Sequence, residues 1–222
     1  MFGRIAQRYD FLNHLLSFNL DRRWRTRAVE RVAGVLERPG ARVLDLCCGT
    51  GDVLLTLEDS RKAAVLGCDF CHPMLVEAKK KIAARRLRSP LFEADALALP
   101  LADASLDLVT IAFGFRNLAN YHSGLEELVR VLKPAGVAAI LEFSQPTNHA
   151  FGAVYRLFSN WVLPWVGGLV SGSREAYSYL PESIRKFPGA EDLAEQMRGA
   201  GFTRVTFERM TGGAVALHIG WR

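Results

Sequence analysis

The sequence predicts an α/β fold in which helices cover both faces of a doubly wound parallel sheet that ends in an antiparallel hairpin. Apolar runs of strand length alternate with helical patterns along most of the chain, as in successive βαβ units. A glycine-rich turn follows the first apolar run, where a buried parallel strand is joined to a ligand-binding helix. Two alternating segments, 202–209 and 214–219, are joined by Thr211-Gly212-Gly213 and are typical of a hairpin.

The 222 residues suit one large domain, and half of them are apolar, as in a globular protein. The first nine residues lack the charged, apolar and small-residue pattern of a secretory signal, so we expect a cytoplasmic protein. Four cysteines fit a reducing compartment. The adjacent pair Cys47 and Cys48 would chelate zinc poorly, and no second metal-ligand pair accompanies Cys68 and Cys71. We therefore predict that the four cysteines pack around the glycine turn and that they form no metal site.

The formal net charge of +5 lies entirely in the N-terminal segment. Residues 1–42 carry 9 Lys and Arg against 4 Asp and Glu, whereas the two signs balance in the rest of the chain. A nucleic-acid partner, an anionic membrane surface and a solvated helix face are all open interpretations. The segment contains no RNA-binding module, so we expect no nucleic-acid partner.

The same segment precedes the sheet and is predicted to be helical. Apolar residues at helical spacing predict two helices within 1–38, separated by a break at 17–19. A segment in this place either covers the bound ligand as a lid or caps the edge of the sheet.

The stretch 43–52, V-L-D-L-C-C-G-T-G-D, contains the first strand, the glycine turn and the start of a helix. Gly49 and Gly51 let the backbone approach a ligand closely, because a side chain at either position would occupy the ligand's volume. We therefore predict that a nucleoside-like ligand binds at this turn.

Elimination narrows the class of ligand. NAD is disfavoured because Leu54 stands where a dinucleotide fingerprint has its third glycine. ATP is disfavoured because the carboxylate of Asp52 would repel a phosphate. A ligand remains that has a cationic or zwitterionic part near Asp45 and Asp52, together with a ribose.

Two further strands end in acidic residues that suit an adenosine. The second strand, 63–68, leads to Asp69, at the spacing of the ribose-binding acid in nucleoside-binding βαβ units. The third strand, 91–92, leads to Asp95 and Ala96, where a carboxylate and a backbone N–H can contact an adenine edge.

The fourth strand, 106–113, is followed directly by Arg116 and Asn117. Ligands of open parallel sheets bind at the carboxyl ends of the strands, so both side chains are expected beside the pocket. A helix over 125–132 and a fifth strand over 137–143 follow. The uncharged stretch 157–173 is rich in aromatic residues but too interrupted to span a membrane, so it forms a core helix, a wall for an apolar substrate or a lipid-facing surface.

Several sequence motifs resemble those of one family. The glycine turn is similar to the S-adenosylmethionine site of class I methyltransferases, with Cys47 where the first glycine usually falls. More specific motifs resemble the ubiquinone/menaquinone biosynthesis C-methyltransferases over almost the whole chain. They are Y-D-F-L-N from Tyr9 with D-R-R-W from Asp21, F-G-F-R-N from Phe113, L-K-P-A-G from Leu132, L-E-F-S-Q-P from Leu141, Y-S-Y-L-P-E-S-I from Tyr177 and A-V-A-L-H from Ala214.

This resemblance implies a class I methyltransferase fold, Rossmann-like, with S-adenosyl-L-methionine as cofactor and a polyprenyl hydroquinone as substrate. It implies methylation of a ring carbon that gives menaquinone from its demethyl form, or the corresponding step towards ubiquinone. Cofactor roles carry over to Thr50, Asp69, Asp95 and Ala96, beside the turn residues Asp45, Gly49 and Gly51. At Ala112 the family often has serine, so a side-chain contact expected there is lost.

The resemblance also suggests which residues act on the substrate. The matched motifs around the predicted pocket contain no histidine to act as a base, so we expect Arg116 to stabilise the phenolate that forms and Asn117 to orient the hydroxyl or a water. The matched motifs place Tyr9, Asn13, Tyr177 and Tyr179 at the substrate.

We divide the single domain into a lid segment (1–40), a cofactor-binding core (41–148), a substrate-cap insertion (149–187) and a C-terminal helix and hairpin (188–222). The substrate's lipid tail suggests peripheral contact with the inner face of the membrane. A non-catalytic scaffold for quinone-making enzymes is the competing hypothesis, and the sequence leaves the quinone ring and a homodimer open.

Overall fold

The computed structural model describes residues 14–15, 17–146, 152 and 181–222. The predicted substrate residues Tyr9, Asn13, Tyr177 and Tyr179 and the aromatic stretch 157–173 lie outside these residues.

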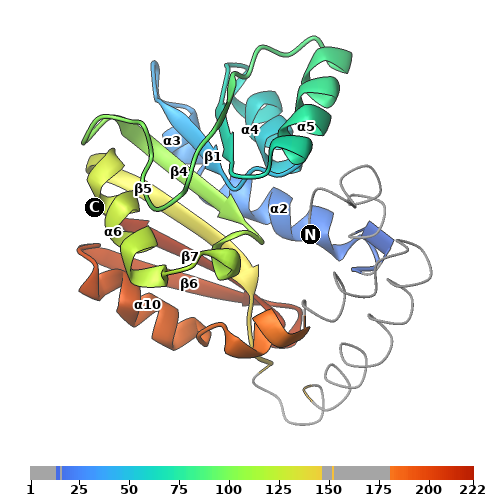
Figure 1. Cartoon of the computed structure of the whole chain (residues 1–222). Coiled ribbons are helices and arrows are strands. Elements are labelled where there is room, and N and C mark those ends of the chain that lie inside the picture. The colour runs from blue at the N-terminus through green and yellow to red at the C-terminus, as the bar shows by residue number, and fades with distance from the viewer. Residues whose placement is uncertain (1–13, 16, 147–151, 153–180) are drawn as a thin grey trace.

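Seven strands form one sheet at the centre of the protein. They span Val43–Leu46 (β1), Leu66–Asp69 (β2), Leu91–Glu93 (β3), Leu106–Ala112 (β4), Leu132–Phe143 (β5), Arg204–Met210 (β6) and Val215–Trp221 (β7). Their order is β3-β2-β1-β4-β5-β7-β6 (Figure 1). Neighbours from β3 to β5 pair in parallel, and β7 is antiparallel to both β5 and β6. The predicted parallel sheet with a C-terminal antiparallel hairpin is confirmed.

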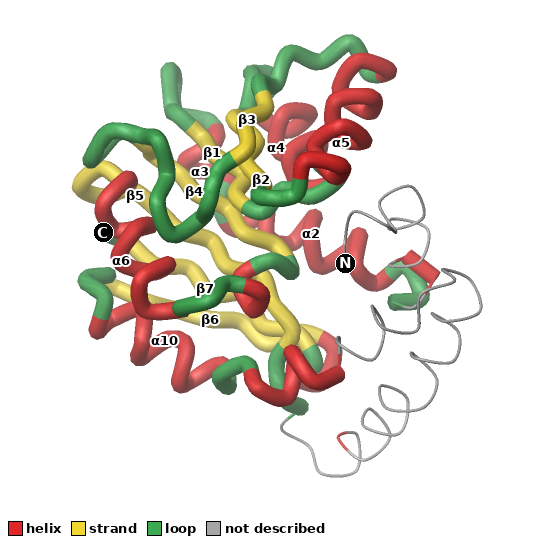
Figure 2. Tube along the Cα trace, in the orientation of Figure 1, coloured by secondary structure: helices red, strands yellow, loops and turns green. Residues whose placement is uncertain are grey.

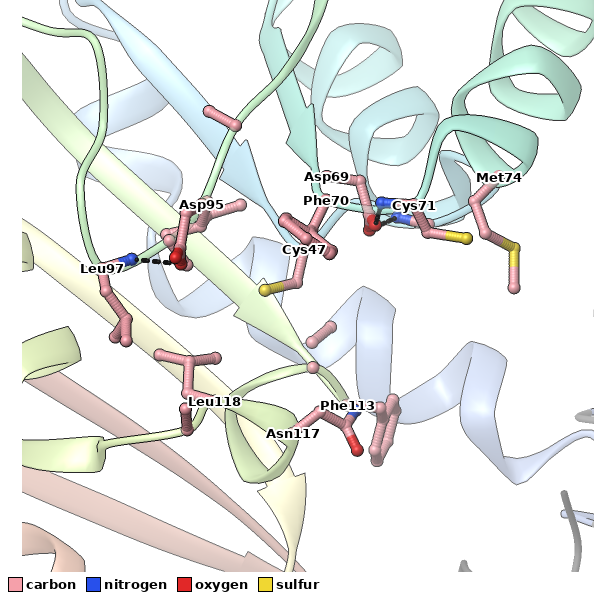
Figure 3. A pocket seen from close by; sticks show the side chains of 17 residues that line it. Cys47, Asp69, Phe70, Cys71, Met74, Asp95, Leu97, Phe113, Asn117 and Leu118 are labelled. Atoms are coloured by element: carbon pink, nitrogen blue, oxygen red, sulfur yellow. Dashed lines mark hydrogen bonds between the residues drawn. The ribbon is translucent and has the colours of Figure 1, made fainter. Parts of the chain in front are cut away.

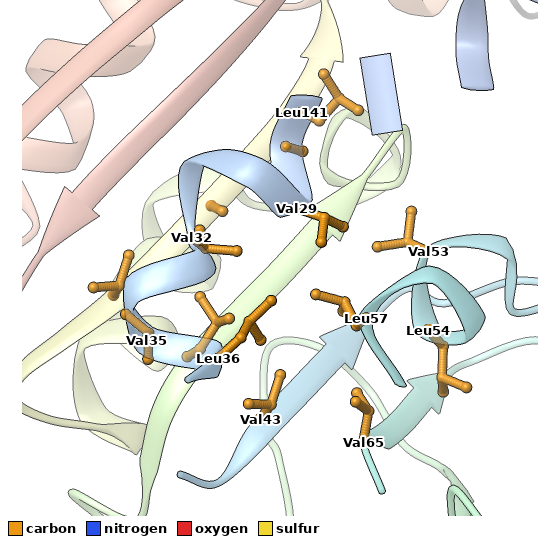
Figure 4. Packing of buried hydrophobic residues seen from close by; sticks show 14 of the residues in the cluster. Val29, Val32, Val35, Leu36, Val43, Val53, Leu54, Leu57, Val65 and Leu141 are labelled. Carbon is orange, nitrogen blue, oxygen red and sulfur yellow. The ribbon is translucent and has the colours of Figure 1, made fainter. Parts of the chain in front are cut away.

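Helices cover both faces of the sheet (Figure 2). The principal helices of the described residues are Leu20–Arg31 (α2), Ala33–Leu36 (α3), Asp52–Arg61 (α4), His72–Ala84 (α5), Tyr121–Val131 (α6) and Ala190–Gly199 (α10). Apolar residues of α2, α3 and α4 pack on one face, against strands that include β1, β4, β5 and β7 (Figure 4). Residues of α6 and α10 pack on the other face. None of the described helices is long and apolar enough to cross a membrane.

The order of the strands reverses beside β1. The chain runs from β1 to β2 and β3 on one side and then returns to place β4 on the other side of β1. Ligands of open α/β sheets bind outside the carboxyl ends of the strands at such a point, because the connections from the two central strands diverge there. Every residue of β1 is buried, which accounts for the apolar side chains at Val43, Leu44 and Leu46; Asp45 is the one polar residue of this strand.

Several element boundaries differ from the predicted ones. β2 begins at Leu66, three residues later than predicted. Residues 133–136, between the predicted helix and the predicted fifth strand, form an irregularity inside β5, where Ala135 has a φ of 61° and the pairing with β4 shifts register. The predicted break between the N-terminal helices is present, because Phe18 and Asn19 both adopt the left-handed conformation.

Candidate active site

A pocket of about 390 Å³ opens at the carboxyl ends of the parallel strands (Figure 3). This volume lies within the range of small-molecule sites, about 300–1,000 Å³. The residues that line it follow β1, β2, β3 and β4, so the reversal in strand order brings four distant parts of the chain together. Of the residues predicted from the sequence, Gly49, Asp69, Asp95, Ala96, Ala112 and Asn117 line this pocket.

The two turn glycines have different structural roles. Both adopt positive φ, 55° at Gly49 and 88° at Gly51. A Cβ on Gly49 would meet nothing within 4 Å, and this residue lines the pocket. A Cβ on Gly51 would lie 3.3 Å from the Cβ of Ala78, on α5. Gly51 therefore allows α4 and α5 to pack closely, and it lines neither this pocket nor the smaller cavity described below. Its predicted contact with the ligand stays a prediction.

Asp69 holds the turn and faces the pocket. Its two carboxylate oxygens accept hydrogen bonds of 2.8 Å from the backbone N–H groups of Gly49 and Cys71. Burial raises the pKa of Asp69 above its ordinary value, although the two amide bonds oppose this shift. Each carboxylate oxygen can accept more than one bond, so ribose hydroxyls can also bind there.

Asp95 and the apolar walls complete the larger pocket. Asp95 is exposed, and its Oδ1 accepts a 2.9 Å bond from the backbone N–H of Leu97. Ala96 is buried beside it, and Phe70 and Leu118 contribute apolar surface. An acid beside flat apolar surface suits a planar base that has polar edges.

A second cavity, of about 40 Å³, adjoins the first. Its lining includes Asp45 and Thr50, which were predicted from the sequence, and Arg25, which was not. Asp45 is 1% exposed, and its Oδ1 accepts a 2.7 Å bond from the hydroxyl of Thr110. Burial raises the pKa of Asp45 to about 7, although the bond from Thr110 opposes this shift.

The carboxylate of Asp52 is paired with cations of the chain itself. Its oxygens accept bonds from Arg25 at 2.9 Å and from Lys81 at 2.7 Å. Burial alone would raise the pKa of Asp52, but these two cations hold it below its ordinary value. We predicted a cationic part of the ligand near Asp52; in the structure Asp52 lines the smaller cavity and its carboxylate is already paired with Arg25 and Lys81.

Arg25 is the functional candidate that the sequence did not single out. It lies on α2, 27 residues before Asp52, and its Nη1 also donates a 2.7 Å bond to Asp21. The sequence offered one signal: Arg25 directly follows the matched D-R-R-W motif. Nothing in the spacing indicates that this side chain turns towards the glycine turn.

The sequence of this chain is similar to those of known methyltransferases. The sequence profile described as the ubiE/COQ5 methyltransferase family matches residues 1–222. The chain belongs to this family. It is therefore an S-adenosylmethionine-dependent methyltransferase, as the resemblance implied.

Two relatives illustrate the similarity at full length. The chain is 52% identical to the demethylmenaquinone methyltransferase of Thermus thermophilus, with 100% of both chains covered. It is 46% identical to the demethylmenaquinone methyltransferase of Deinococcus radiodurans, with 99% of this chain and 90% of the relative covered.

Solved structures support the fold alone. A methyltransferase of Thermotoga maritima, described as a possible histamine N-methyltransferase, has a TM-score of 0.70 at 19% identity and covers 99% of this chain and 97% of its own. The [4+2]-cyclase SpnF has a TM-score of 0.68 at 19% identity, with 89% and 81% covered. Because one of these neighbours is described as a cyclase, the fold by itself does not determine the reaction.

The methyltransferase holds Arg116 in a buried ion pair. Its Nη1 bonds Glu142 at 2.9 Å and also the carbonyl oxygen of Phe113, and Glu142 is 1% exposed. Arg116 does not line the larger pocket, although it was predicted beside it. Its Nε has no hydrogen-bond partner among the described residues.

The thiol of Cys47 lines the pocket at the position where the related sites usually have glycine. Burial raises the pKa of Cys47 well above its ordinary value, and the nearby carboxylate of Asp69 adds to the shift. The thiol is therefore protonated at neutral pH and forms part of the wall rather than acting as a nucleophile. Among the described residues no group of three or more His, Cys, Asp or Glu side chains is arranged to hold a metal ion.

The Arg116–Glu142 pair gives a prediction about stability. Glu142→Leu leaves a buried guanidinium without its counter-charge, so we expect the free energy of unfolding to fall by about 3–5 kcal/mol. The double variant Arg116→Met, Glu142→Leu removes both charges and should recover most of that loss. Urea unfolding followed by circular dichroism measures both. An unchanged midpoint for Glu142→Leu would show that the pair does not stabilise the fold.

Proposed function

We propose that this methyltransferase methylates a ring carbon of demethylmenaquinol and so forms menaquinol. The observation that carries the proposal is the identity of 52% along the full length with a relative of that name. A relative from Syntrophotalea carbinolica, 44% identical, is named a ubiquinone/menaquinone biosynthesis C-methyltransferase, so the benzoquinol ring is the alternative substrate.

The residues of the larger pocket suit the adenosyl part of the cofactor. Asp69 accepts the ribose hydroxyls, while Asp95 and the backbone N–H of Ala96 contact the adenine edge. Gly49 leaves the space that the ligand needs, and Ala112 contributes only its methyl group and backbone. Thr50 lies at the smaller cavity, where its hydroxyl accepts a bond from Lys81.

When bound, S-adenosylmethionine supplies an electrophilic methyl carbon on its sulfonium. The ring carbon is a sufficient nucleophile only when a neighbouring hydroxyl loses its proton, so the protein would have to hold that carbon in line with the methyl group and the sulfur and assist the loss of the proton. Holding the ring carbon, the methyl carbon and the sulfur in line can lower the activation barrier by up to about 7–11 kcal/mol. The pocket walls and the four strand ends provide this rigid placement.

Two residues after β4 are our candidates for assisting the proton loss. Asn117 lines the pocket and is placed to orient the hydroxyl or a water. Arg116 lies directly before it, and its guanidinium, whose buried Nε has no hydrogen-bond partner among the described residues, is our candidate for stabilising the developing phenolate. A donor aimed at developing charge lowers the barrier by about 2.7–4 kcal/mol.

The charge-free double variant separates this role from a structural one. If Arg116 stabilises the phenolate, the variant Arg116→Met, Glu142→Leu remains folded but its turnover falls by about 100-fold or more. A folded variant with normal turnover would show that Arg116 has only a structural role.

The lipid tail of the substrate requires the enzyme to approach a membrane. Leu15 and Phe18 are exposed, Phe18 by 74%, in the turn that precedes α2. Arg22 and Arg23 are exposed in the first turn of that helix. Apolar side chains beside basic ones suit the surface of an anionic bilayer.

The substrate can be identified from the quinones of cells that lack the gene. We expect their extracted quinones to accumulate the demethylated naphthoquinone precursor, identified by mass. Addition of the purified enzyme and cofactor to the reduced precursor should form menaquinol. Accumulation of a benzoquinone precursor would support the alternative ring. Unchanged quinones, or an enzyme that binds no cofactor, would favour the non-catalytic scaffold.

The role of Asp69 has its own test. Each bond between its carboxylate and a hydroxyl contributes about 1.5–3 kcal/mol, so Asp69→Ala should weaken cofactor binding by about tenfold or more. Isothermal titration calorimetry measures the affinity. Asp69→Asn is the matched control, since its amide oxygen can keep one of the two backbone bonds. An Asp69→Ala variant of normal affinity would remove this residue from the site.

Vesicle sedimentation tests the membrane surface. Each basic side chain near an anionic surface contributes about 1 kcal/mol, so binding to anionic vesicles should be weak and should decrease with salt. Phe18→Ser combined with Arg22→Gln and Arg23→Gln should abolish it. The control removes two exposed charges from α5 instead, with Lys79→Gln and Lys80→Gln. Equal binding by both variants, or none by the wild type at low salt, would contradict the proposal.

A further inference from the structure

The turn after β4 carries both residues that are our candidates for assisting the proton loss. It is a 3₁₀ helix of three residues, Phe115–Asn117 (η2), and Asn117 lines the larger pocket (Figure 3). A helix of one turn has few hydrogen bonds of its own, because most of its N–H and carbonyl groups lie at an end. The direction of the Asn117 side chain therefore depends on contacts from other elements.

The two peptide groups that flank Arg116 have all four of their polar groups bonded. The N–H of Asn117 donates to the carbonyl oxygen of Gly114 at 3.0 Å. The carbonyl oxygen of Phe115 accepts a 3.1 Å bond from the N–H of Leu118. The other two groups, the N–H and the carbonyl oxygen of Arg116 itself, are bonded by side chains from other elements.

One of these side chains comes from β5 and the other from α6. The N–H of Arg116 donates to Oε2 of Glu142 at 3.2 Å. The hydroxyl of Tyr121 donates a 3.0 Å bond to the carbonyl oxygen of Arg116. A peptide group is planar, so bonds at its carbonyl and at its N–H fix the orientation of the whole plane. The plane between Arg116 and Asn117 in turn sets the direction in which the Asn117 side chain leaves the backbone.

The Tyr121 ring is held in a cluster of three aromatic rings. It stacks on Phe115 with centroids 5.8 Å apart, and Phe187 contacts it edge-on at 5.3 Å. Both phenylalanines are buried. The start of α6 is fixed as well, because the side chain of Asn120 accepts a 3.1 Å bond from the N–H of Ser123. The hydroxyl of Tyr121 therefore has a defined position.

The same helix leaves room for the turn to approach. A Cβ on Gly124 would lie 2.5 Å from Cδ2 of Leu118 and 3.6 Å from Cε2 of Phe115. Gly124 and Tyr121 are three residues apart and so lie on one face of α6. Glycine at this position lets that face pack against the turn, within reach of the Tyr121 hydroxyl.

We propose that Tyr121 is a positioning residue of the methyl transfer: its hydroxyl holds the peptide group between Arg116 and Asn117 and so directs the Asn117 side chain into the pocket. This inference rests on the proposed role of Asn117 in the reaction. Tyr121 lines neither the larger pocket nor the smaller cavity, so it acts through the backbone of the turn.

The variant Tyr121→Phe removes the hydroxyl and keeps the ring in the aromatic cluster. The carbonyl oxygen of Arg116, a residue that is 6% exposed, then lacks its donor, and the turn is less firmly held. A misplacement of about 1 Å can cost about 100-fold in rate. We therefore expect kcat for reduced demethylmenaquinone to fall by about tenfold or more, while calorimetry finds the cofactor affinity within twofold of wild type.

A double-mutant cycle tests whether Tyr121 acts through Asn117. Asn117→Ala removes the side chain that the turn directs into the pocket. In this background Tyr121→Phe should change kcat by less than about twofold, because there is no side chain left to misplace. If the losses from the two variants multiply, the residues act independently and the inference is overturned.

Ser89→Ala is the matched control for lost stability. The Ser89 hydroxyl is also buried, donates to the carboxylate of Glu58 and accepts a 2.9 Å bond from the N–H of Val65, which precedes β2. This variant should lower the urea midpoint, as Tyr121→Phe does, but leave kcat within twofold of wild type. A tenfold loss of kcat in Ser89→Ala would show that reduced stability alone accounts for the effect of Tyr121→Phe.

Amide hydrogen exchange measures the turn without any substrate. Tyr121→Phe should speed the exchange of the Asn117 and Leu118 N–H groups by about tenfold, while the amides of β1 remain as protected as in wild type. Unchanged exchange at both positions would overturn the inference and leave the proposed function intact. A wild-type enzyme that does not methylate reduced demethylmenaquinone would instead overturn the proposed function, even where faster exchange supports the contact from Tyr121.

Discussion

The divergence of the chain on the two sides of β1 is the constraint on which the site depends. Because β2 and β4 flank β1 in parallel, the segments that follow all three strands emerge at one edge of the sheet. Gly49, Asp69 and Ala112 then line one pocket, although they are far apart in the sequence. The helices pack closely on both faces of the sheet and hold these strands at fixed positions. The residues at the strand ends, which form the pocket walls, are therefore held in place as well.

Charge pairing is the second organising interaction. A buried ion is costly unless another ion compensates it, and several ion pairs near the site join different elements. Asp52 joins α2 to α5 through Arg25 and Lys81, while Arg116 joins the end of β4 to Glu142 on β5. Helix α2 therefore contributes a side chain, Arg25, to the lining of the smaller cavity.

The chemistry depends on these side chains and not on the architecture. A protein described as a [4+2]-cyclase has a similar fold at 19% identity, whereas the relatives named demethylmenaquinone methyltransferases share 40–52% of their residues with this chain. The sequence departs from the family pattern at Cys47, and the neighbouring residues leave room for its side chain. Cys47 adopts a φ of 54°, and a Cβ on Gly114 would lie 2.4 Å from the Cβ of Cys47, so the absence of a side chain at Gly114 accommodates the cysteine.

The sequence by itself determined the strands, the helices, the glycine turn and the family. Apolar periodicity and glycine conformation act over a few residues, so Val43–Leu46, Gly49 and the terminal hairpin could be predicted from local pattern. Asp69 and Asn117 were also predicted at the pocket, because parallel strands end at a common edge. Only the tertiary structure decided which charges meet. Arg25, Asp52 and Lys81 come from three helices, and Gly51 touches Ala78 of α5 rather than the pocket. No spacing along the chain encodes such pairings, because they arise when separately formed helices pack on a sheet and each buried charge must find a counter-charge.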